Sequence, residues 1–330
     1  MGRDRAEGLE RCLKSIQGKV DEIIYVDTGS KDNSVEIAEK YGARVEHFEW
    51  CDDFSAVRNY SLKFATKEWV YIIDTDEELI GDIKASILKC YKAGCDAISL
   101  KINDIRDGEK KGEMVSQVRI MRRAYMSFEL PVHNQILGWA SRYYDPELEF
   151  NHYGYEMTNE QRRKRNEQTL KIALEYVKDH KSAFMYYNIG VACMMKYNYG
   201  DAIEWLEKAI EHKRDLSGDY LAQSYVYLVK IYSVLRDTEK MLQTAQVAAQ
   251  IRPNTELFYD LAAYFYQLHI YDKALEFFGE YMKAYEEHRP SEMYSTALDK
   301  KPAVERAMKY IREVLEWEST RAEGRQSSSQ

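Results

Sequence analysis

The sequence lacks several features that would place it in a common class of protein. No apolar run approaches the roughly 18 residues that cross a bilayer, so no membrane span is expected. No basic region followed by a short apolar one opens the chain, so no secretory signal is expected either. The cysteines are odd in number, scattered and without a Cys-x-x-Cys pair. This pattern favours a reducing, cytoplasmic compartment, in which the cysteine thiols have no chemical role.

Basic charge is also scarce. The 47 lysines and arginines are outnumbered by 55 aspartates and glutamates, which gives a net charge of −8 and argues against a nucleic-acid surface. The composition, 45% hydrophobic and 31% charged, is that of a globular chain, and 330 residues are enough for two domains with their own cores. Partners are therefore expected among small molecules and polypeptides.

Residues 69–78 form a short apolar run that ends in acidic residues. Its β-branched and aromatic side chains predict a strand that is covered on both faces. While the backbone stays extended, side chains two apart point the same way, so Asp74 and Asp76 are expected to project together from the strand's C-terminal end. Ligands of open α/β sheets bind at that edge, and paired carboxylates suit a hard divalent cation that holds a diphosphate. The Asp-x-Asp triplet alone is weak evidence, because so many aspartates produce such triplets by chance, and a solvated turn is the alternative.

Strand and helix patterns alternate through the first 150 residues, which predicts a parallel sheet with right-handed crossovers. The expected strands are residues 21–26, 43–48, 69–73, 97–102, 118–123 and 148–155, and the expected helices are residues 9–17, 32–42, 53–66 and 82–93. Asp27 follows the first strand, so acidic groups should gather at one sheet edge. Ser30 and backbone N–H groups at the next helix start could contact phosphate, although the glycine- and lysine-containing loop of nucleoside triphosphatases is absent.

From about residue 159 the strand patterns disappear and a helical pattern repeats. Three copies carry the small and large positions of a tetratricopeptide repeat, and they start 39 and 33 residues apart, near the 34-residue unit. Such units bury a face only by stacking, which predicts a curved helical array. A capping helix over residues 303–315 and a disordered tail over residues 319–330 are expected after it. The repeat positions are Tyr186, Ile189, Gly190, Cys193, Ala202, Leu206 and Ala209, then Tyr225, Leu228, Val229, Tyr232, Met241, Ala245, Ala248 and Pro253, then Phe258, Leu261, Ala262, Phe265, Ala274, Phe278 and Tyr281.

Five motifs follow one another in a specific order. They are Val26-Asp27-Thr28-Gly29-Ser30, Asp53-Phe54-Ser55-x-x-Arg58-Asn59, Asp74-x-Asp76, Val132-His133 and His152-Tyr153-Gly154-Tyr155. With these motifs, residues 3–300 resemble a bacterial family 2 glycosyltransferase fused to tetratricopeptide repeats, a group that includes enzymes that glycosylate bacteriocin peptides on cysteine. The resemblance implies a Rossmann-like nucleotide-diphospho-sugar transferase domain over residues 1–157, followed by the α-helical array over residues 158–318.

The resemblance also implies roles for single residues. Asp27 would hydrogen-bond the nucleobase of a nucleotide sugar, a UDP-sugar above all, and Arg58 would lie near the base or phosphates. Asp74 would lie near the ribose, and Asp76 would bind the Mn²⁺ or Mg²⁺ that bridges the phosphates and neutralises the leaving group. His152 resembles a third metal ligand beside Asp74 and Asp76, which would favour Mn²⁺. The equally weighted alternative is that His152 is a structural histidine at a domain boundary, with its hydrogen-bonding groups satisfied by the protein.

The chain departs from the family at the expected general base. Relatives commonly have Val-His-Glu there, whereas this chain has Asn134 after His133. An amide cannot remove the acceptor proton in an inverting transfer. Either His133 or another carboxylate, such as Glu129, takes that role, or the acceptor is as acidic as a thiol and needs little help. Glu77 and Glu78 could equally be surface charges.

A second departure concerns the start of the chain. Relatives begin with an apolar strand and a nucleotide-contacting turn, of which Arg3-Asp4 is the expected remnant, preceded here by Met1-Gly2 alone. A parallel sheet without that strand leaves backbone groups unpaired, at about 1–3 kcal/mol for each buried group. Either the natural chain begins upstream of Met1 or this copy is impaired, and we favour the first.

The sequence thus predicts a metal-dependent, inverting hexosyltransferase whose peptide or glycan acceptor is presented by the helical array. The alternative is a peptide-binding repeat protein with a vestigial transferase domain. A nucleotidyltransferase would also use two acids and a metal, but its glycine- and lysine-rich loop is absent. Tyr187 and Tyr227 are candidates to grip a peptide on the concave face. The sugar, the acceptor atom and a homodimer through the helical array stay open.

Overall fold

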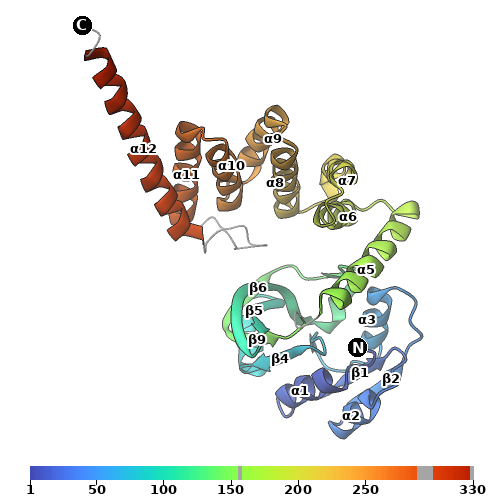
Figure 1. Cartoon of the computed structure of the whole chain (residues 1–330). Helices are drawn as coiled ribbons and strands as arrows, with labels where there is room; N and C mark the ends of the chain where they lie inside the picture. Colours follow the sequence, from blue (N-terminus) through green and yellow to red (C-terminus); the bar gives the residue numbers. More distant parts are fainter. Residues whose placement is uncertain (155–157, 288–299, 328–330) are drawn as a thin grey trace. The chain divides into compact units, whose positions relative to one another are not determined.

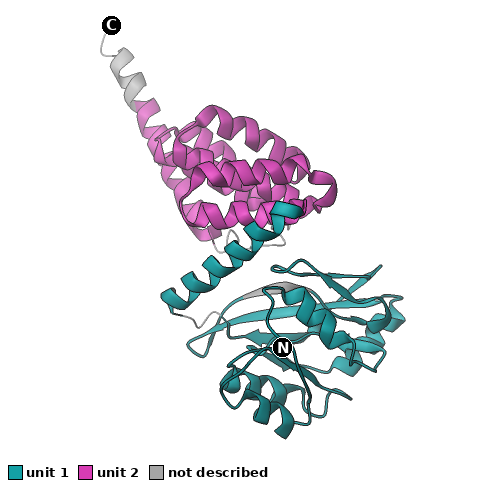
Figure 2. Ribbon diagram, turned by 90° about the vertical axis from the view of Figure 1, so that its right-hand side faces the viewer, with its two compact units in different colours: residues 1–179 teal, residues 180–330 magenta. Residues whose placement is uncertain are grey.

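The computed structural model of the chain describes residues 1–154, 158–287 and 300–327. It divides into two compact units, Met1–Asp179 and His180–Gln330, which are coloured separately in Figure 2. The first unit mixes strands and helices, and the second is helical (Figure 1). The five cysteines are free thiols. Within the described ranges, we find no helix with the length and apolar character that a bilayer crossing requires.

The described residues of the first unit form three groups of strands and five α-helices. β1 (Ile24–Asp27) and β2 (Arg44–His47) form a parallel pair. A five-stranded sheet has the order β3 (Trp69–Tyr71), β6 (Glu109–Arg122), β5 (Ala97–Arg106), β9 (Arg142–His152) and β4 (Glu77–Ile80), and β7 (Ser127–Glu129) pairs with β8 (Gln135–Leu137). The helices are α1 (Ala6–Ile16), α2 (Ser34–Lys40), α3 (Phe54–Leu62), α4 (Ile83–Lys92) and α5 (Asn159–Asp179), with a 3₁₀ turn η1 at Arg123–Tyr125.

The prediction of a parallel sheet holds for β1 and β2 and is wrong for the larger sheet. There β3 pairs antiparallel with β6, and the parallel contact lies between β5 and β9. The cause is a hairpin: Asp107 (φ 52°) and Gly108 (φ 74°) have the left-handed backbone that a two-residue turn requires, so β5 and β6 pair with each other. β4 was not predicted, and it pairs antiparallel with β9.

The core of the first unit forms where α1 and α4 pack on the strands. The predicted stripe on α1 is buried, with Leu9, Leu13 and Ile16 no more than 4% exposed, although the helix begins at Ala6. These side chains contact buried residues of α4, β5, β6 and β9 in one apolar cluster. Each such side chain contributes about 1.5–3 kcal/mol when fully buried, so this cluster holds the sheet that carries the site.

Over residues 180–287 and 300–327, the second unit shows three helix pairs and a long final helix. Its helices are α6 (Ala183–Met195), α7 (Tyr199–Glu211), α8 (Gly218–Leu235), α9 (Thr238–Ile251), α10 (Thr255–Gln267), α11 (Tyr271–Glu286) and α12 (Lys301–Ser327), with a 3₁₀ turn η2 at Lys213–Asp215. Most of the predicted repeat positions are buried, and Ile189 and Leu206 are fully buried. At Gly190 an added Cβ would lie 2.8 Å from Leu206 Cγ, so only glycine allows α6 and α7 to approach this closely. The predicted helical array is confirmed.

Two predicted boundaries differ from the structure. The compact units divide after α5, at residues 179 and 180, and not at residues 157 and 158, because α5 lies against the first unit, where Gln168 Nε2 is 3.4 Å from Asp52 Oδ1. The expected disordered tail over residues 319–330 is helical as far as Ser327, since α12 continues through good helix formers such as Glu318. Residues 157 and 328–330 lie outside the described residues.

The two tyrosines that were expected to bind a peptide are not exposed. Tyr187 is 3% exposed and Tyr227 is 8% exposed. Their rings pack against each other between α6 and α8, with centroids 6.1 Å apart. They therefore stabilise the contact between neighbouring repeats, as Tyr186 and Tyr232 also do at their buried positions.

Candidate active site

Helix α3 positions the first part of the site. Ser55 Oγ donates a hydrogen bond to the carbonyl of Leu130 at 2.6 Å. Asn59 Nδ2 donates to the Phe128 carbonyl at 2.8 Å, and Asn59 Oδ1 accepts from the Phe128 N–H at 2.9 Å. The motif that begins at residue 53 therefore holds α3 against the β7–β8 segment through these hydrogen bonds. They fix the position from which the Arg58 side chain extends toward the acidic turn.

A partly buried ion-pair network holds Asp74. Arg58 Nη2 donates to Asp74 Oδ1 at 2.7 Å, and Arg119 Nη1 donates to Asp74 Oδ2 at 3.2 Å. Arg119 Nη2 also donates to Glu77 Oε1 at 2.8 Å, while Glu77 Oε2 accepts the Asp74 N–H at 2.9 Å. Desolvation opposes ionisation of Asp74, but the two guanidinium groups outweigh it and hold the pKa of this carboxyl well below its usual range. Burial raises the pKa of Glu77.

Asp76 and His152 meet on the other side of the turn. The register of β4 and β9 places Glu77 opposite His152, and this pairing brings the imidazole to within 3.9 Å of Asp76 (Nε2 to Oδ2). The Asp76 carbonyl accepts the Tyr153 N–H at 2.9 Å, which fixes the turn. An added Cβ on Gly154 would lie 2.2 Å from Asp76 Oδ2 and 2.9 Å from His152 Nε2, so a larger residue here would displace these two side chains. Tyr155, the last residue of this motif, lies outside the described residues.

The expected set of three metal ligands is not assembled. Over the described ranges, no three His, Cys, Asp or Glu side chains are placed to hold a metal ion together. The cause is the backbone: β3 ends at Tyr71 and the chain turns at Thr75, so the rule that residues two apart share a face no longer applies. Asp74 faces the two arginines, whereas Asp76 faces His152.

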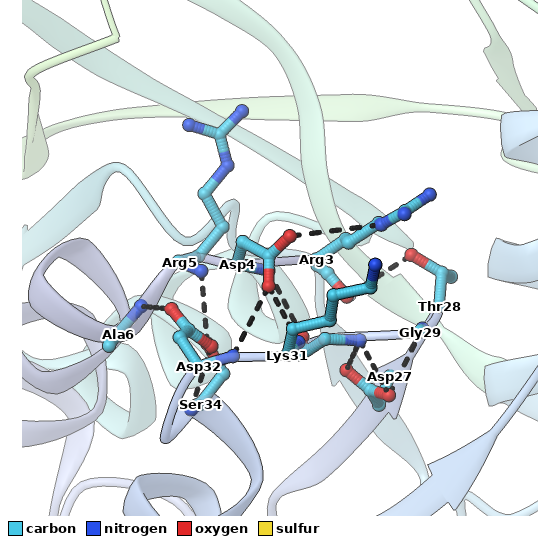
Figure 3. A network of polar contacts seen from close by, with 12 residues as sticks. Arg3, Asp4, Arg5, Ala6, Asp27, Thr28, Gly29, Lys31, Asp32 and Ser34 are labelled. Atoms are coloured by element: carbon cyan, nitrogen blue, oxygen red, sulfur yellow. Dashed lines mark hydrogen bonds and ion pairs between the residues drawn. The ribbon is translucent and has the colours of Figure 1, made fainter.

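Asp27 and Ser30 are held by local contacts, and Figure 3 shows those of Asp27 in the segment around the turn after β1. The Asp27 carboxylate is 5% exposed and accepts the N–H groups of Gly29 at 3.1 Å and Ser30 at 3.2 Å. Ser30 Oγ accepts the Asp4 N–H at 3.0 Å. Desolvation is outweighed by these hydrogen bonds, so the pKa of Asp27 is lowered. Contacts of Asp27 with a nucleobase and of Ser30 with phosphate stay predictions.

The loop between β7 and β8 carries the candidate bases. Leu130 (φ 74°) and His133 (φ 51°) both have a left-handed backbone, which is strained for side chains of this size and is typical of functional loops. Glu129 is exposed at the end of β7. The Nδ2 atom of Asn134 is buried and finds no hydrogen-bond partner in the described part of the chain.

Sequence reasoning missed two residues of the site. Arg119 lies between the buried Val118 and Ile120 of β6, and its guanidinium bridges two carboxylates. The signal was present, because an arginine inside a strand covered on both faces requires a buried partner. Glu77 is 0% exposed and is no surface charge, and Glu78 accepts a hydrogen bond from the Tyr153 hydroxyl at 2.7 Å.

Arg58 offers an unused donor beside this network. Its Nε is buried and has no hydrogen-bond partner within the described ranges, although its Nη2 is engaged by Asp74. A buried guanidinium N–H without an acceptor is costly, and it suits an anionic ligand. The arrangement therefore offers a positive donor on one side of the acidic turn and the Asp76–His152 pair on the other.

Comparisons with known proteins give the family of the first unit. Residues 3–150 match the family model described as glycosyl transferase family 2. A TPR repeat-containing protein of Synechococcus elongatus is 30% identical over 228 residues, which are 64% of this chain and 55% of that protein. The SPbeta prophage-derived glycosyltransferase SunS of Bacillus subtilis is 32% identical over 88 residues, which are 26% of this chain and 21% of SunS.

Among solved structures, S. aureus TarS has 15% sequence identity and a TM-score of 0.42, over 74% of this chain and 53% of that chain. The chain thus spans about half the length of the Synechococcus relative and of TarS. The family match covers the motifs from Asp27 to His133 and ends at Phe150, before His152. Residues 3–150 are thus similar to glycosyl transferase family 2, and a helical array follows them.

Proposed function

We propose that the chain is a hexosyltransferase that moves a sugar from a nucleotide diphosphate, with inversion, to a peptide or glycan acceptor presented by the helical array. The observation that carries the proposal is the Asp76–His152 pair, with Nε2 and Oδ2 3.9 Å apart and both atoms close to where a Cβ at position 154 would lie. This pair lies at the turn that follows the acidic strand. Arg58, whose Nε–H has no partner in the described residues, pairs with Asp74 just before that turn. The family match of the first unit agrees with it.

Asp76 and His152 are the residues that would hold a divalent cation. Cations that bind nucleotide phosphates take one or two protein ligands and complete their coordination with phosphate oxygens and water, so two ligands are enough. An imidazole beside a carboxylate favours Mn²⁺ over Mg²⁺. Desolvation lowers the pKa of His152, which leaves its ring neutral at pH 7 with a lone pair for a metal. When bound, the cation would neutralise the charge that develops on the departing diphosphate.

Arg58 and Asp74 act on the donor without holding the metal. The ion pair between them orients Arg58, whose free Nε–H is then directed at a phosphate or ribose oxygen of the donor. Arg119 holds Asp74 from the opposite side. Asp27 and Ser30 are proposed to contact the nucleobase and a phosphate, with UDP as the nucleotide.

The β7–β8 loop is proposed to bind the acceptor and to remove its proton. His133 is proposed as the general base, because partial desolvation and the positive charge of Arg165 lower its pKa and keep the imidazole neutral at pH 7. Asn134 cannot accept the proton, but its buried, unpartnered amide can position an acceptor or sugar hydroxyl. Glu129 is the second candidate base, and a thiol acceptor would need the least help.

The alternative function is peptide or protein capture by the helical array, with a vestigial transferase domain. The sheet topology favours it, because in the described residues β1 and β2 form a two-stranded sheet that is separate from the five-stranded sheet carrying β3. An incomplete sheet would weaken the positioning of Asp27 relative to Asp74. The helical array itself is well formed and needs no such completion.

One experiment separates the two functions. Purified full-length protein is incubated with Mn²⁺ and UDP-glucose or UDP-N-acetylglucosamine, and UDP release is compared between the wild type, Asp76→Ala and the control Glu39→Ala. Glu39 is an exposed carboxylate on α2. Release that is lost in Asp76→Ala, retained in the control and abolished by a chelator supports transfer. No release from any nucleotide sugar, together with capture of a peptide, supports the alternative.

A further inference from the structure

Two acidic side chains, Glu256 and Asp260, lie one helical turn apart on α10 of the second unit (Figure 1). They are four positions apart, so they share one face of the helix, and we call them the acidic pair. Glu256 is 5% exposed and the side chain of Asp260 is 21% exposed, so the pair extends from the surface into the protein. Acidic side chains are rarely buried unless a partner balances their charge.

The positive charge around the acidic pair comes from two lysines. Lys230 of α8, a helix that contacts α10, has its Nζ 3.4 Å from Asp260 Oδ2. Lys300, whose charge also acts on the pair, has its Nζ over the Tyr259 ring, 3.9 Å from the ring centroid. Desolvation raises the pKa of both carboxyls of the pair, and the two lysines do not offset it. The lysines therefore leave the acidic pair short of positive charge.

The acidic pair also has unsatisfied oxygens. Glu256 Oε2 and Asp260 Oδ2 are both buried, and neither accepts a hydrogen bond within the described ranges. The contact of Asp260 Oδ2 with Lys230 is thus an ion pair without hydrogen-bond geometry. A buried acceptor without a donor is costly, and a buried carboxylate is more costly than an uncharged group. The two oxygens therefore favour a ligand that supplies both positive charge and N–H groups.

The first unit shows which group satisfies such a pair. There the guanidinium of Arg119 bridges two acidic residues, with Nη1 3.2 Å from Asp74 Oδ2 and Nη2 2.8 Å from Glu77 Oε1. Glu77 is buried and Asp74 is partly exposed, as Glu256 and Asp260 are. A guanidinium can bridge two carboxylates because its donors form a rigid, planar fork, whereas an ammonium acts as a point charge.

We propose that the acidic pair binds the guanidinium of an arginine side chain presented by a polypeptide. The guanidinium donates to Glu256 Oε2 and to Asp260 Oδ2, and it enters past Asp260, the more exposed of the two. The inference deepens the proposed function, because it makes the acceptor a polypeptide with an accessible arginine. It rests on that function only for the acceptor role, since the binding itself requires no sugar transfer.

The test measures peptide binding to the full chain by isothermal titration calorimetry, without donor or metal. The probes are the peptide Gly-Ser-Arg-Ser-Gly, blocked at both ends, and the same peptide with citrulline or lysine in place of arginine. Citrulline keeps the shape of arginine without its charge, and lysine keeps the charge without the planar fork. The arginine peptide is expected to bind at least about tenfold more tightly than either.

Two variants test whether the acidic pair is the binding site. Glu256→Gln and the control Glu276→Gln each remove one acidic charge from the helical array, and Glu276 is exposed on α11. Glu256→Gln is expected to weaken binding of the arginine peptide at least about tenfold and to leave the citrulline peptide unaffected, whereas the control changes neither. Without peptide, Glu256→Gln should unfold at the same or a higher temperature, because it removes a buried charge with an unsatisfied oxygen.

No binding of the arginine peptide, equal binding of the three peptides, or equal loss in the two glutamine variants would overturn the proposal. A lower unfolding temperature of Glu256→Gln would also overturn it, because the acidic pair would then have a structural role. Intact arginine binding without UDP release would contradict the proposed sugar transfer alone. UDP release without preference for the arginine peptide would contradict this inference alone.

Discussion

Gly154→Ala is the perturbation that the site geometry defines most sharply. The new Cβ would lie 2.2 Å from Asp76 Oδ2 and 2.7 Å from His152 Cε1, far inside van der Waals contact. The carboxylate must therefore move by about 1 Å, and a misplacement of that size costs about a hundredfold in rate. A hundredfold loss in kcat/KM corresponds to about 2.7 kcal/mol of transition-state stabilisation. Folding should be little affected, because neither side chain belongs to the apolar core.

The assay for Gly154→Ala is the initial rate of UDP release with Mn²⁺, together with the affinity for Mn²⁺ in the presence of UDP. The matched control is Gly112→Ala in the same unit, where a new Cβ would meet no atom within 4 Å. The control should retain both the rate and the affinity. The reasoning is refuted if Gly154→Ala keeps its Mn²⁺ affinity and rate, or if Gly112→Ala loses as much.

Three further substitutions or conditions probe the network, the metal and the repeats. Arg119→Met should destabilise the first unit by about 3–5 kcal/mol in urea unfolding, because it leaves the buried Glu77 carboxylate without its cation, while Asp74 keeps Arg58. The Mn²⁺ affinity should be constant above about pH 6.5 and should fall as pH drops through the lowered pKa of His152, because the ring then binds a proton in place of the metal. Gly190→Val should destabilise the second unit by about 1–3 kcal/mol in thermal unfolding, since its Cβ would meet Leu206 Cγ at 2.8 Å.

Each of these has an outcome that contradicts it. An Arg119→Met variant within 1 kcal/mol of the wild type, a level typical of exposed ion pairs, would mean that the network is solvated. A pH profile that is unchanged in His152→Ala would show that another group sets the dependence. Gly200→Ala, whose Cβ would meet nothing within 4 Å, is the control for the repeats. Equal destabilisation by the two glycine substitutions would contradict the inference that Gly190 is needed for the close packing of α6 and α7.

Much of the fold could be predicted because its signals are local. The stripe on α1 and the repeat positions around Gly190 follow helical periodicity, and the structure buries them as expected. The topology of the larger sheet is not a local property. It depends on which strands meet, and the two-residue turn at Asp107 and Gly108 directs β6 back along β5, so that β6 occupies one edge of β3.

The sequence indicated which residues belong to the candidate site better than it indicated how their side chains are arranged. Asp76 and His152 meet as the motifs implied, because the register of β4 against β9 brings them together. Asp74 was assigned to the same face as Asp76, but that inference held only for an extended backbone, and the chain turns between them. Arg119 is distant in sequence, and no spacing rule links it to Asp74. Its pairing follows from burial, which single-sequence patterns indicate only indirectly.

The most direct test of the central idea is the position of Mn²⁺ in crystals grown with UDP. Anomalous scattering locates the ion without any assumption about the reaction. The account predicts one peak within about 2.0–2.3 Å of a carboxylate oxygen of Asp76 and of Nε2 of His152, and no bond to Asp74. A peak bound by Asp74 and away from His152, or no peak at saturating Mn²⁺ and UDP, would contradict it.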